Sequence, residues 1–193
     1  MEASRRMMEL IINSFKESAD VKLAFVELYA QQILEVGKII AQAIKEGNKL
    51  LLFGNGGSAA DAQHIAAEIV GRFKKERKAL PAIALTTDTS VLTAVGNDYG
   101  FETIFERQIE ALCMPGDVVI GITTSGNSEN VIRGLSKAHA LGATTVAFTG
   151  RKGGKVVDVA HYSFIVPSYD TARIQECHIT LGHVLCELID NLL

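Results

Sequence analysis

Apolar side chains recur at helical spacing through the first 47 residues of the chain. They lie at Leu10, Ile11, Phe15, Leu23, Val26, Ala30, Ile33, Leu34, Gly37, Ile40, Ala41 and Ile44. A period near 3.6 residues predicts amphipathic helices. We expect two N-terminal helices, broken near Ala19-Asp20, with Gly47-Asn48 ending the second.

Short apolar runs replace this pattern between residues 48 and 170. They are Leu50–Phe53, Ala82–Leu85, Val118–Ile122, Thr145–Phe148 and Ser163–Val166. Most of them are followed by a helical or partly helical stretch. Continuous apolar strands alternating with helices are typical of a parallel sheet covered on both faces. The pattern therefore predicts a single doubly wound α/β domain, with a five-stranded parallel sheet at residues 48–170.

The C-terminal segment, residues 171–193, predicts one more helix, from about Ala172 to Leu193. It is apolar on nearly every side, so it is buried in the domain or in a subunit interface. Gln175, Glu176, His178 and His183 lie among these apolar residues. Buried polar side chains need partners, so this helix must meet polar groups.

Composition narrows the class of protein. The chain has 193 residues, 48% of them apolar and 21% charged, which fits one globular domain. The formal charge of −3 gives no electrostatic reason to expect nucleic acid or an anionic membrane as partner. No segment resembles a membrane span or a signal peptide. Cys113, Cys177 and Cys186 form no CxxC pair, so a reducing cytoplasm is the expected location.

Two strand ends are rich in glycine and hydroxyl groups. The first loop, FGNGGSAADAQH (residues 53–64), has three glycines before a helix that starts near Ser58. The second, GITTSGNSEN (residues 121–130), gathers Thr123, Thr124, Ser125 and Ser128 around Gly126. Free amides at a helix N-terminus together with hydroxyl groups can bind a phosphate without a fixed cation. The alternative is a pair of ordinary strand-to-helix turns.

Two basic segments resemble motifs that they do not complete. GRKGGK (residues 150–155) looks like part of a P-loop, but Val156 stands where Ser or Thr would bind magnesium, so we expect an exposed turn. RFKKERK (residues 72–78) lacks an aromatic platform beyond Phe73 and is expected to be a solvated face rather than a nucleic-acid patch.

His64 and Glu68 lie four residues apart on the helix after the first loop and therefore share one face. Such a pair is often only a surface pair, unless the buried C-terminal helix supplies partners. His178 and His183 are about 140° apart around a helix and cannot both face one small site. Gln175 lies about 80° from His183, while Glu176 is nearly in line with it. Geometry leaves the choice between Gln175 and Glu176 open.

Four segments together resemble the phosphoheptose isomerase family of the sugar-isomerase (SIS) domain superfamily. They are GNGGSAADAQHIAAE, LTTDTSVLTAVGNDYGFE, GITTSGNSENVIRG and ARIQECHITLGH, in family order, and the resemblance extends from about Lys22 onward. It implies a flavodoxin-like SIS fold and a homotetramer with active sites at subunit interfaces. It also implies conversion of sedoheptulose 7-phosphate to D-glycero-D-manno-heptose 7-phosphate, the first step of nucleotide-activated heptose biosynthesis.

The resemblance also implies the site residues. Glu68 would be the catalytic base and His183 the acid. One zinc ion per subunit would be held by His64, Glu68, Gln175 and His183; glutamine is a poor zinc ligand, so partial occupancy is expected. The substrate would be bound by Asn55, Gly56, Gly57, Ser58, Glu68, Asn97, Asp98, Thr123, Thr124, Ser125, Ser128 and Gln175.

Two departures and two alternatives accompany this resemblance. Thr123 stands where several members have Ser. Ala172 stands where some members have Asp, and Asp170 or Asp98 would have to supply that carboxylate.

Non-enzymatic SIS adaptors that bind the replication initiator have segments similar to ARIQE and LCELIDN, but an adaptor has no need of Glu68 together with His183. An isomerase for another phosphosugar would use the same residues.

Overall fold

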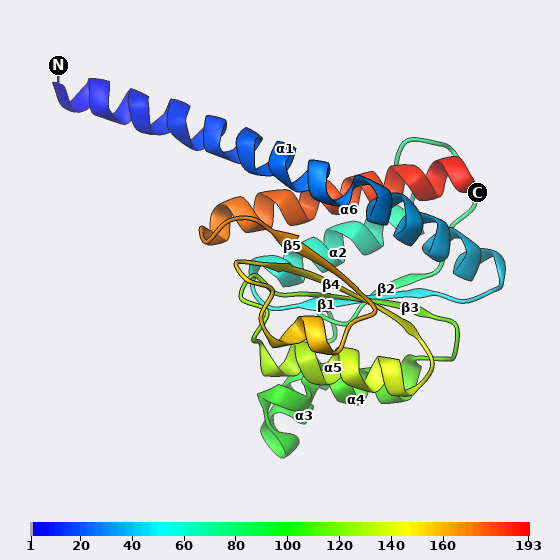
Figure 1. The fold of residues 1–193 in the computed structure, drawn as a ribbon. Coiled ribbons are helices and arrows are strands. Elements are labelled where there is room, and N and C mark those ends of the chain that lie inside the picture. Colours follow the sequence, from blue (N-terminus) through cyan, green and yellow to red (C-terminus); the bar gives the residue numbers. More distant parts are fainter. Residues whose placement is uncertain (1) are drawn as a thin grey trace.

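The computed structural model describes residues 2–193, which form one α/β domain around a parallel sheet (Figure 1). The strands are β1 (Leu50–Gly54), β2 (Ala82–Ala84), β3 (Val118–Ile122), β4 (Thr144–Gly150) and β5 (Tyr162–Val166). The α-helices are α1 (Glu2–Lys45), α2 (Gly57–Val70), α3 (Thr89–Tyr99), α4 (Ile104–Leu112), α5 (Glu129–Ala140) and α6 (Thr171–Leu192). Two short 3-10 turns, η1 (Phe101–Thr103) and η2 (Lys155–Asp158), complete the elements. The strand order is β2-β1-β3-β4-β5, which confirms the predicted five-stranded, doubly wound sheet.

The central strands are apolar throughout because helices cover both faces of the sheet. Every residue of β1 and β3 is buried. One core lies between the sheet and α1, α2 and α6; the other lies between the sheet and the layer of α4 and α5, flanked by α3 (Figure 1). A strand with two covered faces has no polar side to show, which explains the continuous apolar runs.

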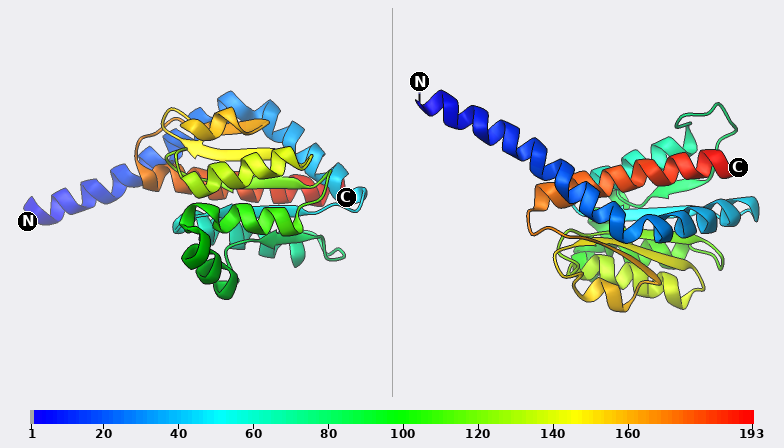
Figure 2. Two further views of the ribbon diagram at one scale, coloured as in Figure 1. Left: turned by 90° about the horizontal axis from the view of Figure 1, so that it is seen from below. Right: turned by 45° about the horizontal axis from the view of Figure 1, so that its top comes forward.

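The N-terminus differs from the sequence prediction. Residues 2–45 form one helix, α1, and not two helices broken near Ala19-Asp20. Neither Ala19 nor Asp20 breaks a helix, and no proline or glycine precedes Gly37 within α1. The buried residues of α1 begin at Phe25, and the first half of the helix projects beyond the rest of the domain in both views of Figure 2.

The long C-terminal helix, α6, is sandwiched between α1 and α2. Its buried positions include Ile174, Cys177, Leu181, Leu185 and Ile189. This arrangement accounts for apolar residues on more than one side of the helix, and it fixes the direction in which each polar side chain of α6 points. Within residues 2–193, no helix is long and apolar enough to cross a membrane.

The basic segment at residues 72–78 is only partly the solvated face that we predicted, because its backbone and one arginine bind α6. Asp190, whose side chain is 1% exposed, accepts hydrogen bonds from the Arg77 Nε atom at 2.7 Å and from the Lys74 backbone amide at 2.8 Å. Burial alone would raise the pKa of Asp190, but these hydrogen bonds outweigh it and hold the pKa below 3.8. The ion pair anchors the loop that leaves α2.

Replacing Asp190 with asparagine should lower the free energy of unfolding by about 3 kcal/mol, because Arg77 then keeps a buried charge without its counterion. Because the folded pKa of Asp190 is depressed, its contribution is present above pH ~4 and lost as the pH falls through the folded pKa. Urea unfolding at neutral and acidic pH measures both effects. Glu187→Gln is the matched control, because Glu187 pairs with Lys74 at the exposed surface and should change stability by less than about 1 kcal/mol. Equal losses in the two variants would contradict the assignment.

Candidate active site

Strand order brings the first loop and the hydroxyl-rich loop together. The parallel strands β1 and β3 are neighbours, with Gly54 beside Ile122 at their carboxyl ends. The chain leaves β1 toward β2 on one side and β3 toward β4 on the other, so these two loops meet where the strand order reverses. The side-chain amides of Asn55 and Asn130 join them through a pair of hydrogen bonds, each 2.9 Å long.

The hydroxyl loop, defined as residues 123–128, is ordered by its own side chains. The hydroxyl groups of Thr123 and Ser128 are 3.0 Å apart and hydrogen bonded. The backbone amide of Asn127 donates to the Ser125 Oγ atom at 3.2 Å, which leaves the Ser125 hydroxyl proton free to donate elsewhere. Ser128 precedes α5 as its N-cap residue, so the loop leads into the positive end of that helix. Neutral donors of this kind suit a phosphate.

Two histidines and a glutamate form the second part of the site, the histidine cluster. His64 and Glu68 lie on α2 and His183 lies on α6. The Nε2 atom of His64 is 3.2 Å from the Nε2 atom of His183 and 3.3 Å from the Glu68 Oε1 atom. The ring of Phe73 stacks on His183, with 5.6 Å between the ring centroids. His64 thus links the pair to another helix, as a surface pair alone would not.

The structure separates Gln175 from Glu176. Gln175 lies against the first loop, where a Cβ atom at Gly57 would be only 2.5 Å from its Nε2 atom. Glu176 turns toward α1 and pairs with Arg173, which also hydrogen bonds the Ser14 carbonyl. Glycine at position 57 therefore makes room for the amide of Gln175.

The side chains of the histidine cluster are of the types that usually bind zinc. As the side chains stand, no group of three or more His, Cys, Asp or Glu residues between positions 2 and 193 could hold a metal ion. Imidazoles and a carboxylate are nonetheless usual zinc ligands. The 3.2 Å between the two Nε2 atoms is near the roughly 3.3 Å that separates two nitrogen ligands in a tetrahedral site.

Among residues 2–193, Asn97 and Asp98 hydrogen bond to each other and not to the other predicted site residues. They are exposed at the end of α3, and the Asn97 amide donates to the Asp98 carboxylate at 2.8 Å. In the described chain, neither residue forms a hydrogen bond or ion pair with the first loop, the hydroxyl loop or the histidine cluster. Asp170, the other candidate to replace a carboxylate at Ala172, is engaged as the N-cap of α6 and accepts from the Ala172 amide at 2.8 Å.

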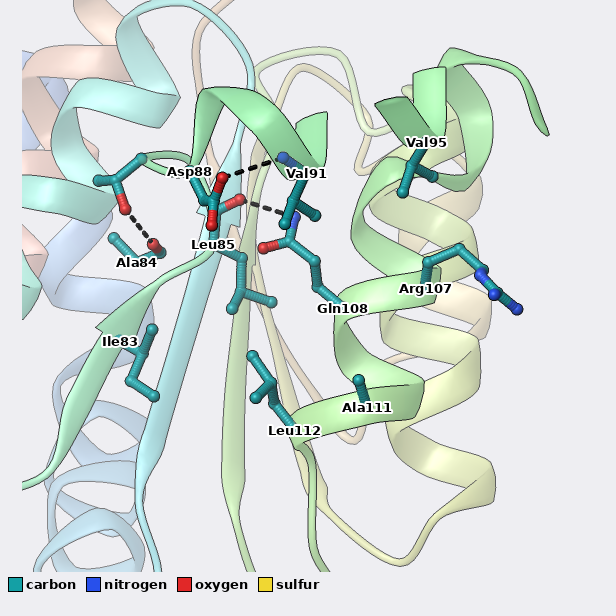
Figure 3. A pocket seen from close by; sticks show the side chains of 11 residues that line it. Ile83, Ala84, Leu85, Asp88, Val91, Val95, Arg107, Gln108, Ala111 and Leu112 are labelled. Atoms are coloured by element: carbon teal, nitrogen blue, oxygen red, sulfur yellow. Dashed lines mark hydrogen bonds between the residues drawn. The ribbon is translucent and has the colours of Figure 1, made fainter. Parts of the chain in front are cut away.

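Two cavities lie near the carboxyl ends of β1 and β2. One of about 170 Å³ is lined by Asn55 and Gly56 of the first loop, together with Thr86, Leu92 and Phe101. A larger one, of about 490 Å³, lies between β2, α3 and α4 (Figure 3). Its lining is mostly apolar and includes none of the site residues predicted from sequence, so we assign the chemistry to the loops and the histidine cluster.

Sequence reasoning missed three residues of this region. Asn130 joins the two loops, Asn127 binds within the hydroxyl loop, and Phe73 stacks on His183. The two asparagines lie inside the segment GITTSGNSEN. Their position beside a predicted phosphate-binding turn could have marked them as candidates. Phe73 had no such signal, because only the fold brings the loop after α2 next to α6.

Comparisons with known proteins find relatives over nearly the whole chain. The family model described as the SIS domain matches residues 14–150. A phosphoheptose isomerase from Aquifex aeolicus is 80% identical over 186 residues, which cover 96% of this chain and 97% of that protein. The solved phosphoheptose isomerase structure from Neisseria gonorrhoeae is 44% identical, with a TM-score of 0.91 over 96% of this chain and 99% of that one. The structure from Francisella tularensis is 37% identical, with a TM-score of 0.92 over 96% and 98%.

Both the shared fold and the identity over nearly the full length of these relatives point to one assignment. The chain belongs to the phosphoheptose isomerase family of SIS-domain proteins, and with it to the isomerases.

Proposed function

We propose that this protein converts sedoheptulose 7-phosphate to D-glycero-D-manno-heptose 7-phosphate by aldose–ketose isomerisation, with Glu68 as base and His183 as acid. The observation that carries the proposal is the approach of Glu68 and His183 to His64, across two helices, α2 and α6. The phosphate would bind at Thr123, Thr124, Ser125 and Ser128, with Ser58 at the start of α2. Asn55, Gly56, Gly57 and Gln175 would hold the sugar.

The proposed reaction moves two protons. Glu68 removes a proton from C1 of the ketose while His183 protonates the oxygen on C2, which gives an enediol. His183 then takes the proton from the oxygen on C1, and Glu68 returns a proton to C2 to form the aldose. Both groups must lie near a sugar held in one pose, and a phosphate fixed by the hydroxyl loop would supply that constraint.

Zinc belongs to this proposal, held by His64, Glu68, Gln175 and His183. When bound, zinc supplies a Lewis acid that polarises the substrate oxygens. The proposal rests on the kinds of donor present and on the short distance between the two imidazoles.

We also propose a homotetramer whose active sites are completed across subunit interfaces. Met7, Met8, Leu10, Ile11, Ile12 and Phe15 are 48% to 77% exposed on the projecting half of α1. An apolar face of this extent on a soluble chain is typical of an interface, and a second copy carries the matching face. Asn97 and Asp98, which are exposed and whose side chains hydrogen bond only to each other in the described residues, would then serve a neighbouring site. A cytoplasmic location fits the three free, buried cysteines.

The acid–base assignment is tested by His183→Asn and Glu68→Gln. Each should lower kcat by a factor of ~10²–10⁴ while the melting temperature changes little, because Asn and Gln keep polar contacts but cannot exchange a proton near neutral pH. Deuterium from D₂O should enter the phosphosugar only with active enzyme, measured by mass spectrometry. His139→Asn, an exposed histidine stacked on His161, is the matched control and should behave as wild type. Normal turnover in His183→Asn would exclude that residue as the acid.

The metal assignment predicts that chelation lowers activity without unfolding the protein. The two helices that carry the ligands, α2 and α6, are held by apolar packing in the core and do not need the metal to fold. Zinc binding to the chelated protein, measured by competition with a coloured chelator, should be lost in His64→Ala and kept in His139→Ala. A chelated protein as active as the zinc-loaded one would make the metal incidental.

The tetramer is tested by Phe15→Glu, at the most exposed of the six apolar side chains. A charge in the centre of an apolar interface should lower the mass measured by light scattering. Lys16→Glu, the exposed neighbouring residue, is the control and should keep the wild-type mass. A wild-type protein that runs as a monomer would rule out this part of the proposal.

A further inference from the structure

The turn after β4, residues 150–156, is not the simply exposed turn expected from GRKGGK. Arg151, Lys152 and Lys155 are exposed, but Gly153 is buried and Val156 belongs to the apolar core on the α4 and α5 side of the sheet. The Val156 backbone amide donates to the Gly126 carbonyl at 2.9 Å. We call residues 150–156 the brace turn, because the backbone of the hydroxyl loop rests on it.

Asn127 links the two segments through its side chain. Its Oδ1 atom accepts from the Lys155 backbone amide at 3.2 Å, and its Nδ2 atom donates to the Ser125 carbonyl at 3.0 Å. The side chain therefore ties the backbone of Ser125 to the brace turn. The Ser125 hydroxyl itself receives the Asn127 backbone amide, so both groups of Ser125 depend on this residue.

Glycines allow the two backbones to touch. Gly126 has φ +70° and Gly154 has φ +69°, a region that favours glycine. A Cβ atom at Gly126 would overlap the Gly153 carbonyl oxygen. A Cβ atom at Gly154 would lie 2.6 Å from both the carbonyl carbon of Gly126 and the carbonyl oxygen of Ser125. Any side chain at position 154 must therefore push the hydroxyl loop away.

The brace turn is in turn fixed to the interior of the protein. The Thr149 hydroxyl donates to the Gly153 carbonyl at 2.9 Å, and the buried ring of His178 hydrogen bonds the Thr149 carbonyl through Nε2 at 3.0 Å. Burial lowers the pKa of His178 to about 4, so the ring is neutral and Nε2 donates. His178 lies on α6, the helix that also carries Gln175 and His183. The helix α6 therefore supports the hydroxyl loop, through Thr149 and the brace turn, and also carries His183 of the histidine cluster.

We propose that Asn127 and Gly154 are positioning residues that set the hydroxyl loop for a phosphate before the phosphate arrives. Donors that are already aimed at their ligand lose less conformational entropy on binding, so the brace turn would determine affinity for the phosphate group. The inference rests on the proposed function for its substrate, but anion binding itself can be measured without turnover.

The test compares Gly154→Ala with Gly142→Ala. Gly142 has φ +83°, so both variants place an alanine at a positive φ. At Gly142 the new Cβ would lie 3.5 Å from Pro115, an ordinary contact, whereas at Gly154 it displaces the hydroxyl loop. We expect Gly154→Ala to raise the Kd for inorganic phosphate, measured by calorimetry, at least tenfold. It should raise KM for the phosphoketose by a similar factor with a smaller loss in kcat, while Gly142→Ala leaves both unchanged.

Asn127→Ala provides a second variant that needs no backbone change. It should raise the phosphate Kd severalfold, and its effect in a Gly154→Ala background should be smaller than in wild type, because both substitutions release the same loop. If Gly154→Ala does not fold, the Kd and KM of Asn127→Ala decide the question.

The outcomes separate this inference from the proposed function. In the first outcome, the wild-type protein binds phosphate, Gly154→Ala does not, and no phosphosugar is isomerised. This result supports the inference and overturns the proposed function. An active isomerase whose phosphate Kd and KM are unchanged in Asn127→Ala and Gly154→Ala overturns the inference alone, and the brace turn is then merely structural. A wild-type chain that binds no phosphate overturns it as well.

Discussion

The pairing of β1 with β3 is the contact on which the rest of the structure depends. Both strands are buried on both faces, so their register is fixed by packing on two sides rather than one. Their carboxyl ends then fall side by side, and the chain must leave them in opposite directions. Two loops with free amides, each leading into a helix, meet at that point. The Asn55–Asn130 pair joins loops whose positions the strands have already determined.

The helix α6 fixes the positions of the other polar groups near the site, as the paired strands fix the two loops. It lies between α1 and α2 and cannot rotate without exposing Ile174, Leu181 or Leu185. Its polar residues therefore point in fixed directions: Gln175 to the first loop, Glu176 to α1, His178 to the end of β4 and His183 to the histidine cluster. Burying a polar side chain in an apolar helix is costly, and the fully buried His178 hydrogen bonds to the Thr149 carbonyl on β4. The other three are partly buried: Gln175 lies against Gly57, Glu176 pairs with Arg173 of the same helix, and His183 meets His64 on α2. One rigid helix thereby aligns groups that are far apart in the sequence.

The sequence alone predicted the five strands, the doubly wound sheet and the final helix, because burial on both faces leaves a continuous apolar pattern. The break at Ala19-Asp20 was wrong, since residues 2–45 form one helix and neither proline nor glycine stands near those two residues. The choice between Gln175 and Glu176 was open. Consecutive residues of a helix point about 100° apart, so the choice depends on which elements pack against α6, and the sequence does not show them. Asn127, Asn130 and Phe73 were missed for a related reason: their partners are 28, 75 and 110 residues away in the chain.

A phosphate site made of hydroxyl groups and backbone amides has a physical requirement that lysine and arginine sites lack. Neutral dipoles attract an anion strongly only where water is excluded, because in bulk water their field is screened. In the single chain, Thr124, Ser125 and Ser128 are only partly buried, and Asn127 beside them is exposed. Preordering the donors by the brace turn and covering the loop from outside are two ways to meet this requirement. In the proposed tetramer, Asn97 and Asp98, which are exposed at the end of α3, would provide the second way: polar groups from one copy that close the site of another.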